Sequence, residues 1–176
     1  MKRVFINDAN LKDEDIDYEV IRVKGLVINS NDELILVENN HTYQLPGGHN
    51  RKDEPLEATL SREIREELGY DIEIKTGPFM MITTYDPDYF ESGSRVCNKI
   101  YYYVVYSDIE PNLDNVRLDA QETETDFSLF KIPMKDLELF LNNCMEDGSI
   151  DKCIGREMLL VNQEYNEKFG EVIWEF

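Results

Sequence analysis

The stretch that decides the fold runs from Gly47 to Tyr70 and reads GGHNRKDEPLEATLSREIREELGY. It predicts a glycine turn followed by a helix over 55–68, because Pro55 suits a first helical turn and Gly69 suits the position just past a helix end. At about 100° per residue, one stripe of this helix is apolar. The stripe consists of Leu56, Leu60, Ile64 and Leu68. We therefore expect this face to pack against the core, with the glycine turn close beside it.

Three carboxylates share one arc of the same helix. Relative to Leu56, Glu63 and Glu67 project to about −20° and +20°, on the apolar stripe, and Glu66 projects to about −80°. Burial and the helix dipole both disfavour negative charge there. Two like charges ~4 Å apart repel by roughly 4 kcal/mol at an effective dielectric of about 20. A bound divalent cation explains this crowding most simply, and oxygen-only ligands favour Mg²⁺ or Mn²⁺.

Other groups beside the helix could complete such a site. Arg62 lies one turn before Glu66 and is placed to hold its carboxylate in an ion pair. The Pro46-Gly47-Gly48 turn could add a carbonyl oxygen, since glycine has no side chain to obstruct an ion. The alternative is a solvated acidic helix with Glu–Arg pairs, the common meaning of a lone Glu-Glu pair in an acidic chain.

The full pattern is much longer than such a pair. The sequence from Gly48 to Tyr70 resembles the Nudix box at every fixed position. Five residues separate Gly48 from Glu54, and seven residues separate Glu54 from the run that begins at Arg62. With residue frequencies of ~5–10%, such a match arises by chance in about one chain per million. The preceding LPGGH and the later SLFKIPMKDL are also typical, so the resemblance covers most of residues 20–146. The one mild departure is Tyr70, a position at which the family more often has an aliphatic residue.

This resemblance implies an α/β/α sandwich with a central mixed β-sheet, in which the box forms a loop–helix–loop. It implies a magnesium-dependent hydrolase, with manganese possible, that cuts a nucleoside diphosphate linked to a group X into a nucleoside monophosphate and phosphorylated X. By position, it assigns metal binding to the Gly47 carbonyl and to Glu63, Glu66 and Glu67. Glu54 would support the loop or bind a second metal. Catalysis falls to Glu63, Glu67 and Arg62, with Arg62 orienting a ligand.

The general base varies among members of the family and often lies outside the box. Glu122 and Glu124, in AQETETDF before an expected strand, are the candidates. A solvated acidic loop explains each of them at least as well.

The loop YDPDYFESGSR carries the candidate substrate contacts. Tyr85 and Tyr89 could stack on a base, and Arg95 could hold a phosphate or carboxylate, although aromatic residues there also close core edges. A proline beyond the box is the family's marker for ADP-ribose, and a tyrosine slightly further on is its marker for dinucleoside polyphosphates. Tyr85, Pro87 and Tyr89 all lie near that window. ADP-ribose, nucleotide sugars, dinucleoside polyphosphates and (d)NTPs therefore stay open.

The length and the net charge of the chain limit the kinds of molecule that it could bind. The 176 residues, 41% hydrophobic and 31% charged, suit one globular domain over 1–176, with its core at about 20–146. The net charge of −19 argues against a nucleic-acid face, an RNA-cap substrate and an anionic membrane surface. We expect a small nucleotide as partner, and a homodimer is possible.

The cysteines and the N-terminal sequence indicate the cellular compartment in which the protein is expected. Cys97, Cys144 and Cys153 are too widely spaced for a disulfide framework or a zinc site. The start, MKRVFINDANLK, has no apolar stretch of signal-peptide length, and the apolar run 100–106 is too short to span a bilayer. These features predict a cytoplasmic protein.

Outside the box, strands and helices alternate irregularly, which indicates an α/β or α+β class. Residues 1–18 are polar and acidic and predict a flap or an edge element. Strands are expected at 20–28, 33–37, 43–45, 72–84, 99–106, 127–132 and 172–174, and helices at 135–145 and 151–168.

A nucleotide sensor that uses the same fold without catalysis is the competing hypothesis. Proteins of that kind usually lose carboxylates of the box. This chain keeps all four, Glu54, Glu63, Glu66 and Glu67, which favours the enzyme.

Overall fold

The computed structural model describes residues 1–39, 42–117 and 126–170. Its strands are β1 (Lys2–Ile6), β2 (Tyr18–Ile28), β3 (Glu33–Asn39), β4 (Thr42–Gln44), β5 (Met80–Asp86), β6 (Val96–Tyr106) and β7 (Phe127–Pro133). Its α-helices are α1 (Leu56–Leu68), α2 (Leu137–Asp147) and α3 (Lys152–Phe169). Within the described residues the strands form one sheet in the order β1-β5-β6-β2-β3-β4, with β7 paired to β3.

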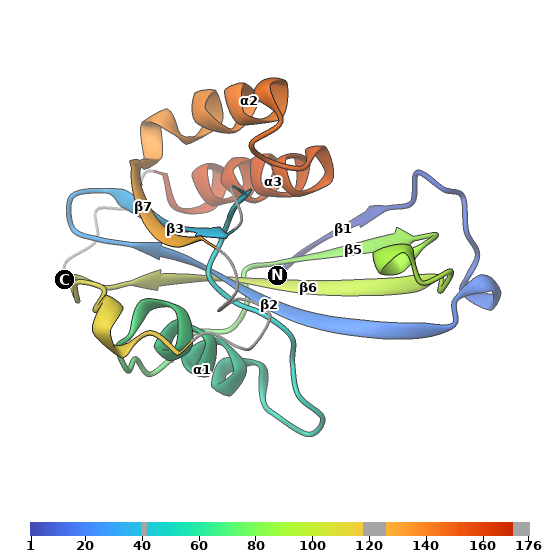
Figure 1. Cartoon of the computed structure of the whole chain (residues 1–176), viewed down its shortest axis with the longest axis horizontal. Coiled ribbons are helices and arrows are strands. Elements are labelled where there is room, and N and C mark those ends of the chain that lie inside the picture. Colours follow the sequence, from blue (N-terminus) through green and yellow to red (C-terminus); the bar gives the residue numbers. More distant parts are fainter. Residues whose placement is uncertain (40–41, 118–125, 171–176) are drawn as a thin grey trace.

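The sheet is mixed and lies between two helical layers. β2 runs parallel to β6, and β1 runs parallel to β5, whereas β5 and β6 are antiparallel. Helix α1 covers one face, while α2 and α3 cover the other (Figure 1). This arrangement confirms the expected α/β/α sandwich.

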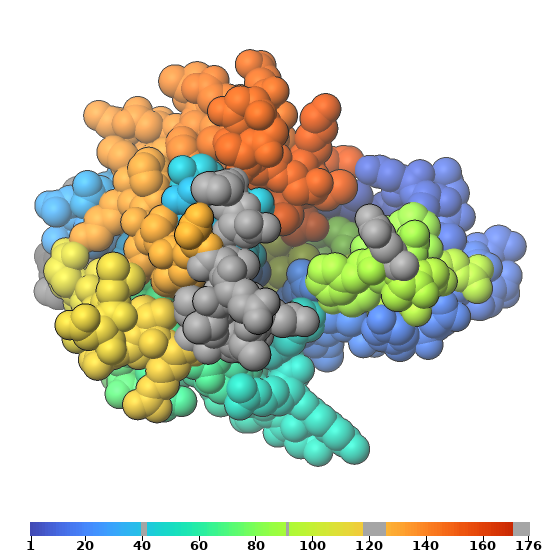
Figure 2. All heavy atoms as spheres, in the orientation of Figure 1, coloured from blue at the N-terminus to red at the C-terminus, as the bar shows by residue number. Residues whose placement is uncertain are grey.

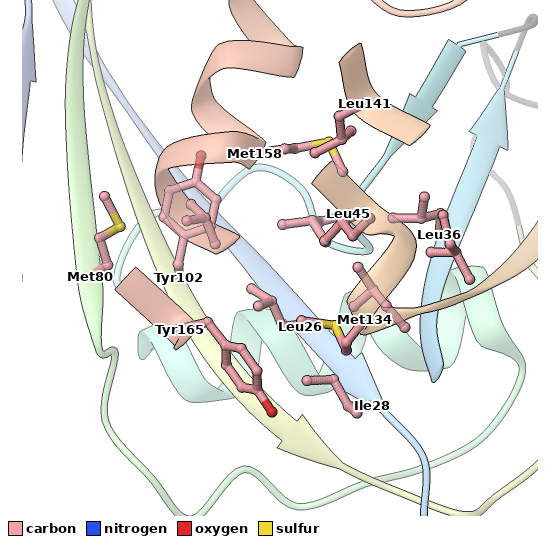
Figure 3. Packing of buried hydrophobic residues seen from close by; sticks show 14 of the residues in the cluster. Leu26, Ile28, Leu36, Leu45, Met80, Tyr102, Met134, Leu141, Met158 and Tyr165 are labelled. Atoms are coloured by element: carbon pink, nitrogen blue, oxygen red, sulfur yellow. The ribbon is translucent and has the colours of Figure 1, made fainter. Parts of the chain in front are cut away.

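Each helical layer closes its own apolar core. Leu60, Ile64 and Leu68 of α1 are fully buried against the sheet, as the helical stripe predicts. On the other face, α2 and α3 pack over residues such as Leu26 and Ile28 (Figure 3). Residues of β2 therefore alternate between the two cores, which makes this strand the centre of the molecule.

One end of the sheet projects beyond the helices. β1, β5 and the first halves of β2 and β6 reach past the ends of α1 and α3 (Figure 1). β1 pairs only with β5 among the described strands, so residues 1–18 supply an edge element as expected. The sheet face there is free to carry a pocket beside the start of α3.

The expected strand at 72–84 is wrong in its first half. Residues 71–79 have no strand structure, and β5 begins at Met80. Ile72 and Ile74 still pack against the α1 core, which accounts for the apolar alternation. Pro78 has no N–H to donate to a ladder, and Gly77 weakens an extended segment, so pairing starts after them.

Smaller differences concern the ends of helices. Pro55 is the N-cap of α1 rather than part of its first turn, and Gly69 ends the helix with a left-handed φ of 74°. Helix α2 begins at Leu137 after a short 3-10 turn, and Asp151 is the N-cap of α3. The strand expected at 172–174 lies outside the described residues. No helix in the described ranges has the length and apolarity needed to cross a bilayer.

Candidate functional site

The glycine turn is held against the edge of β2. Val23 N–H donates to the Gly48 carbonyl at 3.0 Å, and Gly25 N–H donates to the Pro46 carbonyl at 2.9 Å. Gly47 has a φ of +129°, and a Cβ atom there would lie 2.1 Å from the Val23 carbonyl oxygen. Only glycine fits this position, because both its backbone angle and its contact with β2 exclude a side chain.

Glu67 ties this turn to helix α1. Its side chain is buried, with the residue 4% exposed, and its Oε2 accepts the Gly47 N–H at 2.7 Å. A carboxylate that accepts a backbone N–H forms a strong, short hydrogen bond. Glu67 therefore fixes the position of the Gly47 backbone relative to α1.

Arg62 gathers three carboxylates. Its Nε donates to Glu54 at 3.0 Å, and its Nη1 donates to Glu63 at 2.7 Å and to Glu66 at 3.0 Å. The last contact confirms the ion pair predicted from the i,i+4 spacing. Nη2 adds a bond of 3.0 Å to the His49 carbonyl, which links the cluster to the glycine turn.

The charged groups in this cluster shift one another's pKa values. Burial opposes the charge of Arg62, but its hydrogen bonds to Glu54 and Glu63 raise its pKa above the ordinary value. The same contact with Arg62 lowers the pKa of Glu54 to about 2. Burial raises the pKa of Glu63, although Arg62 opposes this. A second positive group near Glu63 would make its ionised form easier to keep.

Gly48 leaves room for Glu63. A Cβ atom on Gly48 would lie 2.6 Å from Oε1 of Glu63. The carboxylate thus occupies the space that any other residue's side chain would fill.

These residues supply the right donors for a hard divalent cation. Glu63, Glu66, Glu67 and the Gly47 carbonyl are all oxygen ligands, the kind that Mg²⁺ prefers. In the part of the chain that the structure describes, however, no three acidic, histidine or cysteine side chains surround a common point. Arg62 lies between Glu63 and Glu66 instead, so a guanidinium supplies part of the compensation that the sequence assigned to a metal. The donor set fits the ion, and Arg62 holds two of the donors.

Lys24 of β2 is a site residue that the sequence did not reveal. Its Nζ donates to the carbonyls of Leu45 and Gly47, at 2.9 and 2.8 Å, and to Oε1 of Gln44 at 3.1 Å. Burial lowers its pKa, and the charges of Glu67 and Glu63 act against that. All three ammonium protons point at the chain leading into the glycine turn. Lys24 was detectable as a charged residue two positions before Leu26, on a strand that also carries Glu19 and Arg22.

The three residues expected to bind substrate do not lie together in the structure. Tyr85 and Tyr89 both line a pocket of 570 Å³ between β5, β6 and the start of α3. Arg95 does not line it and lies near the carboxylates of Asp15 and Asp17, at 3.7 and 3.9 Å. The two candidate bases, Glu122 and Glu124, lie outside the described residues.

The pocket adjoins the box. Tyr89 Oη accepts a hydrogen bond of 2.7 Å from Nη2 of Arg22 and lies 3.2 Å from Nε2 of His49, the residue whose carbonyl binds Arg62. In Figure 2 the blue N-terminal segment, the yellow-green loop after β5 and the red-orange start of α3 meet around this hollow. The lining of the pocket thus contacts His49, the residue that follows the glycine turn.

The solved structures of two microbial proteins, among others, are similar to this fold. A MutT protein from Methanosarcina mazei Go1 aligns with a TM-score of 0.57 and 15% identity, covering 85% of this chain and 96% of its own. A NUDIX hydrolase from Nitrosomonas europaea aligns with a TM-score of 0.56 and 12% identity, covering 89% and 96%. Both support the α/β/α sandwich that carries a loop–helix–loop beside a mixed sheet. No curated protein sequence matches the chain.

The sequence model of the NUDIX domain matches residues 20–144, from β2 into α2. The chain therefore belongs to the NUDIX family. It is a hydrolase that acts on phosphoric anhydride bonds.

Proposed function

We propose that the enzyme is a magnesium-dependent pyrophosphohydrolase that cleaves a nucleoside diphosphate linked to X. The products are a nucleoside monophosphate and phosphorylated X. The observation that carries this proposal is the α1 cluster, in which Glu54, Glu63 and Glu66 meet around Arg62 while Glu67 holds the Gly47 turn. Within the described residues, these acidic groups supply the oxygen donors that a phosphate-bound cation requires.

Glu63, Glu66, Glu67 and the Gly47 carbonyl would hold the cation, with Glu54 at the edge of the site. Bound Mg²⁺, or Mn²⁺, would neutralise phosphate oxygens and lower the pKa of a water molecule. Arg62 keeps Glu63 and Glu66 in position, and Glu67 and Lys24 fix the backbone of the turn from two sides. The proton of the attacking water needs a carboxylate as acceptor, for which Glu122 and Glu124 stay the candidates.

The substrate class follows from charge and from the neighbouring pocket. A net charge of −19 opposes a polyanionic nucleic acid but is compatible with a small nucleotide whose phosphates are neutralised by metal. Tyr85 and Tyr89 line the pocket beside the box, where they could contact the part of the substrate that carries no phosphate. All three cysteines are free thiols, which fits the reducing cytoplasm.

The test is a phosphate-release screen with Mg²⁺ over ADP-ribose, nucleotide sugars, dinucleoside polyphosphates and (d)NTPs. We expect turnover of at least one compound, with a nucleoside monophosphate as product. Glu66→Gln and Glu67→Gln should each lower kcat by at least about 100-fold, since each removes charge from the metal-binding set.

The matched control is Glu73→Gln, which removes a carboxylate that is 80% exposed and paired only with Lys75 among the described contacts. It should leave kcat unchanged. Folded protein that binds a nucleotide tightly by calorimetry, yet turns over no compound with Mg²⁺ or Mn²⁺, would support the sensor instead. Equal loss of activity in the control would also contradict the assignment.

A further inference from the structure

Two cations beside the carboxylates of the box have all their hydrogen bonds taken up by the protein. Arg62 makes five hydrogen bonds, to three glutamates of the box and to the His49 carbonyl. A guanidinium carries five N–H groups, so none is left for a substrate. Lys24 directs its three ammonium protons at three acceptors of the chain. Neither cation can bind a phosphate without giving up a bond that holds the site together.

Arg51 is a third cation at this cluster, and its guanidinium is available to a ligand. Its side chain is 65% exposed and lies 3.7 Å from a carboxylate oxygen of Glu66, which is longer than a hydrogen bond. This ion pair is the one partner that the described residues give its guanidinium. An exposed pair of this kind is weak, so Arg51 can exchange it for a better partner. Glu66 is also a proposed metal ligand, and binding of the cation would draw its carboxylate away from Arg51.

The backbone of Arg51 is held in place although its side chain is free. Its N–H donates to Oε2 of Glu54 at 3.2 Å, and the N–H of Glu54 donates to the Arg51 carbonyl at 3.1 Å. Nδ2 of Asn50 donates to the Glu54 carbonyl at 2.9 Å and to the Thr59 hydroxyl at 2.6 Å. The loop that projects before α1 (Figure 1) is therefore tied to the start of that helix. Binding a ligand would order only the side chain of Arg51, which limits the entropic cost.

A free guanidinium at this edge matches the chemistry of the proposed substrate. The chain carries a net charge of −19, so a phosphate group gains little from the rest of the surface. A guanidinium can hold a phosphate through two parallel N–H···O bonds, which an ammonium group cannot do. Such contacts also stabilise the negative charge of a phosphoryl group during its transfer.

We propose that Arg51 binds a phosphate group of the substrate beside Glu66. The proposal rests on the proposed function, because the carboxylates next to Arg51 are those assigned to the metal. It makes Arg51 a substrate-binding residue rather than a residue that holds Glu66 in position. These two roles predict different results when Arg51 is replaced.

The first test measures binding of imidodiphosphate, a non-hydrolysable analogue of pyrophosphate, to the full chain with Mg²⁺ by titration calorimetry. Arg51→Gln should raise its Kd by about 10-fold or more, the loss expected for a charge-assisted hydrogen bond. Arg51→Lys should recover part of the affinity, because it keeps the charge without the paired N–H groups. Unchanged affinity in Arg51→Gln, or no binding of imidodiphosphate to the unaltered protein, would overturn the proposal.

Arg65→Gln is the matched control for the loss of one positive charge. Arg65 lies on α1, is 53% exposed and pairs at 3.6 Å with a carboxylate oxygen of Asp71, outside the cluster. Its replacement should change the Kd of imidodiphosphate by less than about twofold, since only the overall field changes. Equal weakening by the two substitutions would show that net charge alone matters, and would overturn the specific role of Arg51.

Manganese binding separates substrate binding from a positioning role. Titration of Mn²⁺ alone, followed by the electron paramagnetic resonance of the free ion, should show equal or slightly tighter binding to Arg51→Gln. The reason is that a like charge beside Glu66 has been removed. If Arg51 served to hold Glu66 for the metal, the same substitution would weaken Mn²⁺ binding, and that result would overturn the proposal.

Kinetics separate this inference from the proposed function. With a substrate from the screen, Arg51→Gln should raise KM by about 10-fold or more and change kcat less. An unchanged KM would overturn the role of Arg51 and leave the hydrolase intact. If the unaltered protein turned over no compound, yet bound imidodiphosphate in a manner that required Arg51, the proposed function would fail and this assignment would stand.

Discussion

At the scale of single residues, Gly48 sets the space available to the carboxylate of Glu63. We expect Gly48→Ala to lower kcat by about 10- to 100-fold, because its methyl group would displace a side chain that holds the metal. Steady-state kinetics with a substrate from the screen would measure this.

Gly77→Ala is the matched control, since a Cβ atom there meets nothing within 4 Å. Its kcat should equal that of the unaltered enzyme. Full activity of Gly48→Ala would mean that the position of Glu63 does not matter to the reaction.

Glu54 gives a second prediction at this scale, for stability against pH. Its pKa of about 2 lies below the ordinary 4.5, so the folded state binds fewer protons than the unfolded state between these values. The resulting stability is present above pH 4.5 and is lost as pH falls toward 2. Urea unfolding with a chelator present should show Glu54→Gln less stable at pH 6, with the gap shrinking toward pH 3. A gap that stays constant with pH would refute the shift.

At the scale of elements, α1 owes its position to the apolar stripe on its buried face. Leu60 is fully buried against β2, where its Cδ1 lies 3.1 Å from the place of a Gly25 Cβ atom. We expect Leu60→Ala to lower the free energy of unfolding by about 2–5 kcal/mol, as is usual for such a cavity. Denaturant titration would measure the loss.

Leu139→Ala is the control for this element-scale prediction. Leu139 lies on α2 and is 66% exposed, so its loss should change the free energy of unfolding by no more than about 0.5 kcal/mol. Equal effects of the two substitutions would show that the α1 core does not hold the helix.

At the scale of the whole molecule, a net charge of −19 opposes the approach of an anionic substrate. Salt screens charges more than about 10 Å apart at 0.1 M ionic strength. At saturating Mg²⁺, we therefore expect kcat/KM to rise about two- to fivefold between 20 and 150 mM salt, with kcat nearly constant. Stopped or continuous assays with NaCl and KCl would check it. A steady fall of kcat/KM with either salt would indicate an attractive field instead.

Features of the chain that depend on local sequence could be predicted, and those that depend on contacts across the whole molecule could not. The box helix was predictable because its signals are local: the apolar stripe of α1, the Arg62–Glu66 spacing and Gly69 at its end all depend on residues within a few turns. The strand expected at 72–84 was wrong because apolar alternation records burial, and Ile72 and Ile74 are buried without belonging to the sheet.

The pocket could not be foreseen from local signals. Arg22, Asn98 and Glu157 come from β2, β6 and α3, and no spacing rule joins three elements so far apart in the chain. Asn98 also precedes the strand expected at 99–106, so its side of the sheet could not be assigned. Of these site residues, only Arg22 and Lys24 were indicated by the sequence. They are two charged residues two positions apart on the expected strand, and they share the face of that strand that carries the apolar Leu26.

By itself, the sequence determined the helix of the box and its acidic face, because periodicity and capping act over short distances. The resemblance to the Nudix box implied the mixed sheet behind that helix. Only the tertiary structure decided that Arg62 would also bind Glu54 and Glu63, and that Lys24 would fix the glycine turn. Strand pairing and helix packing set those distances, and they depend on contacts between residues remote in the chain.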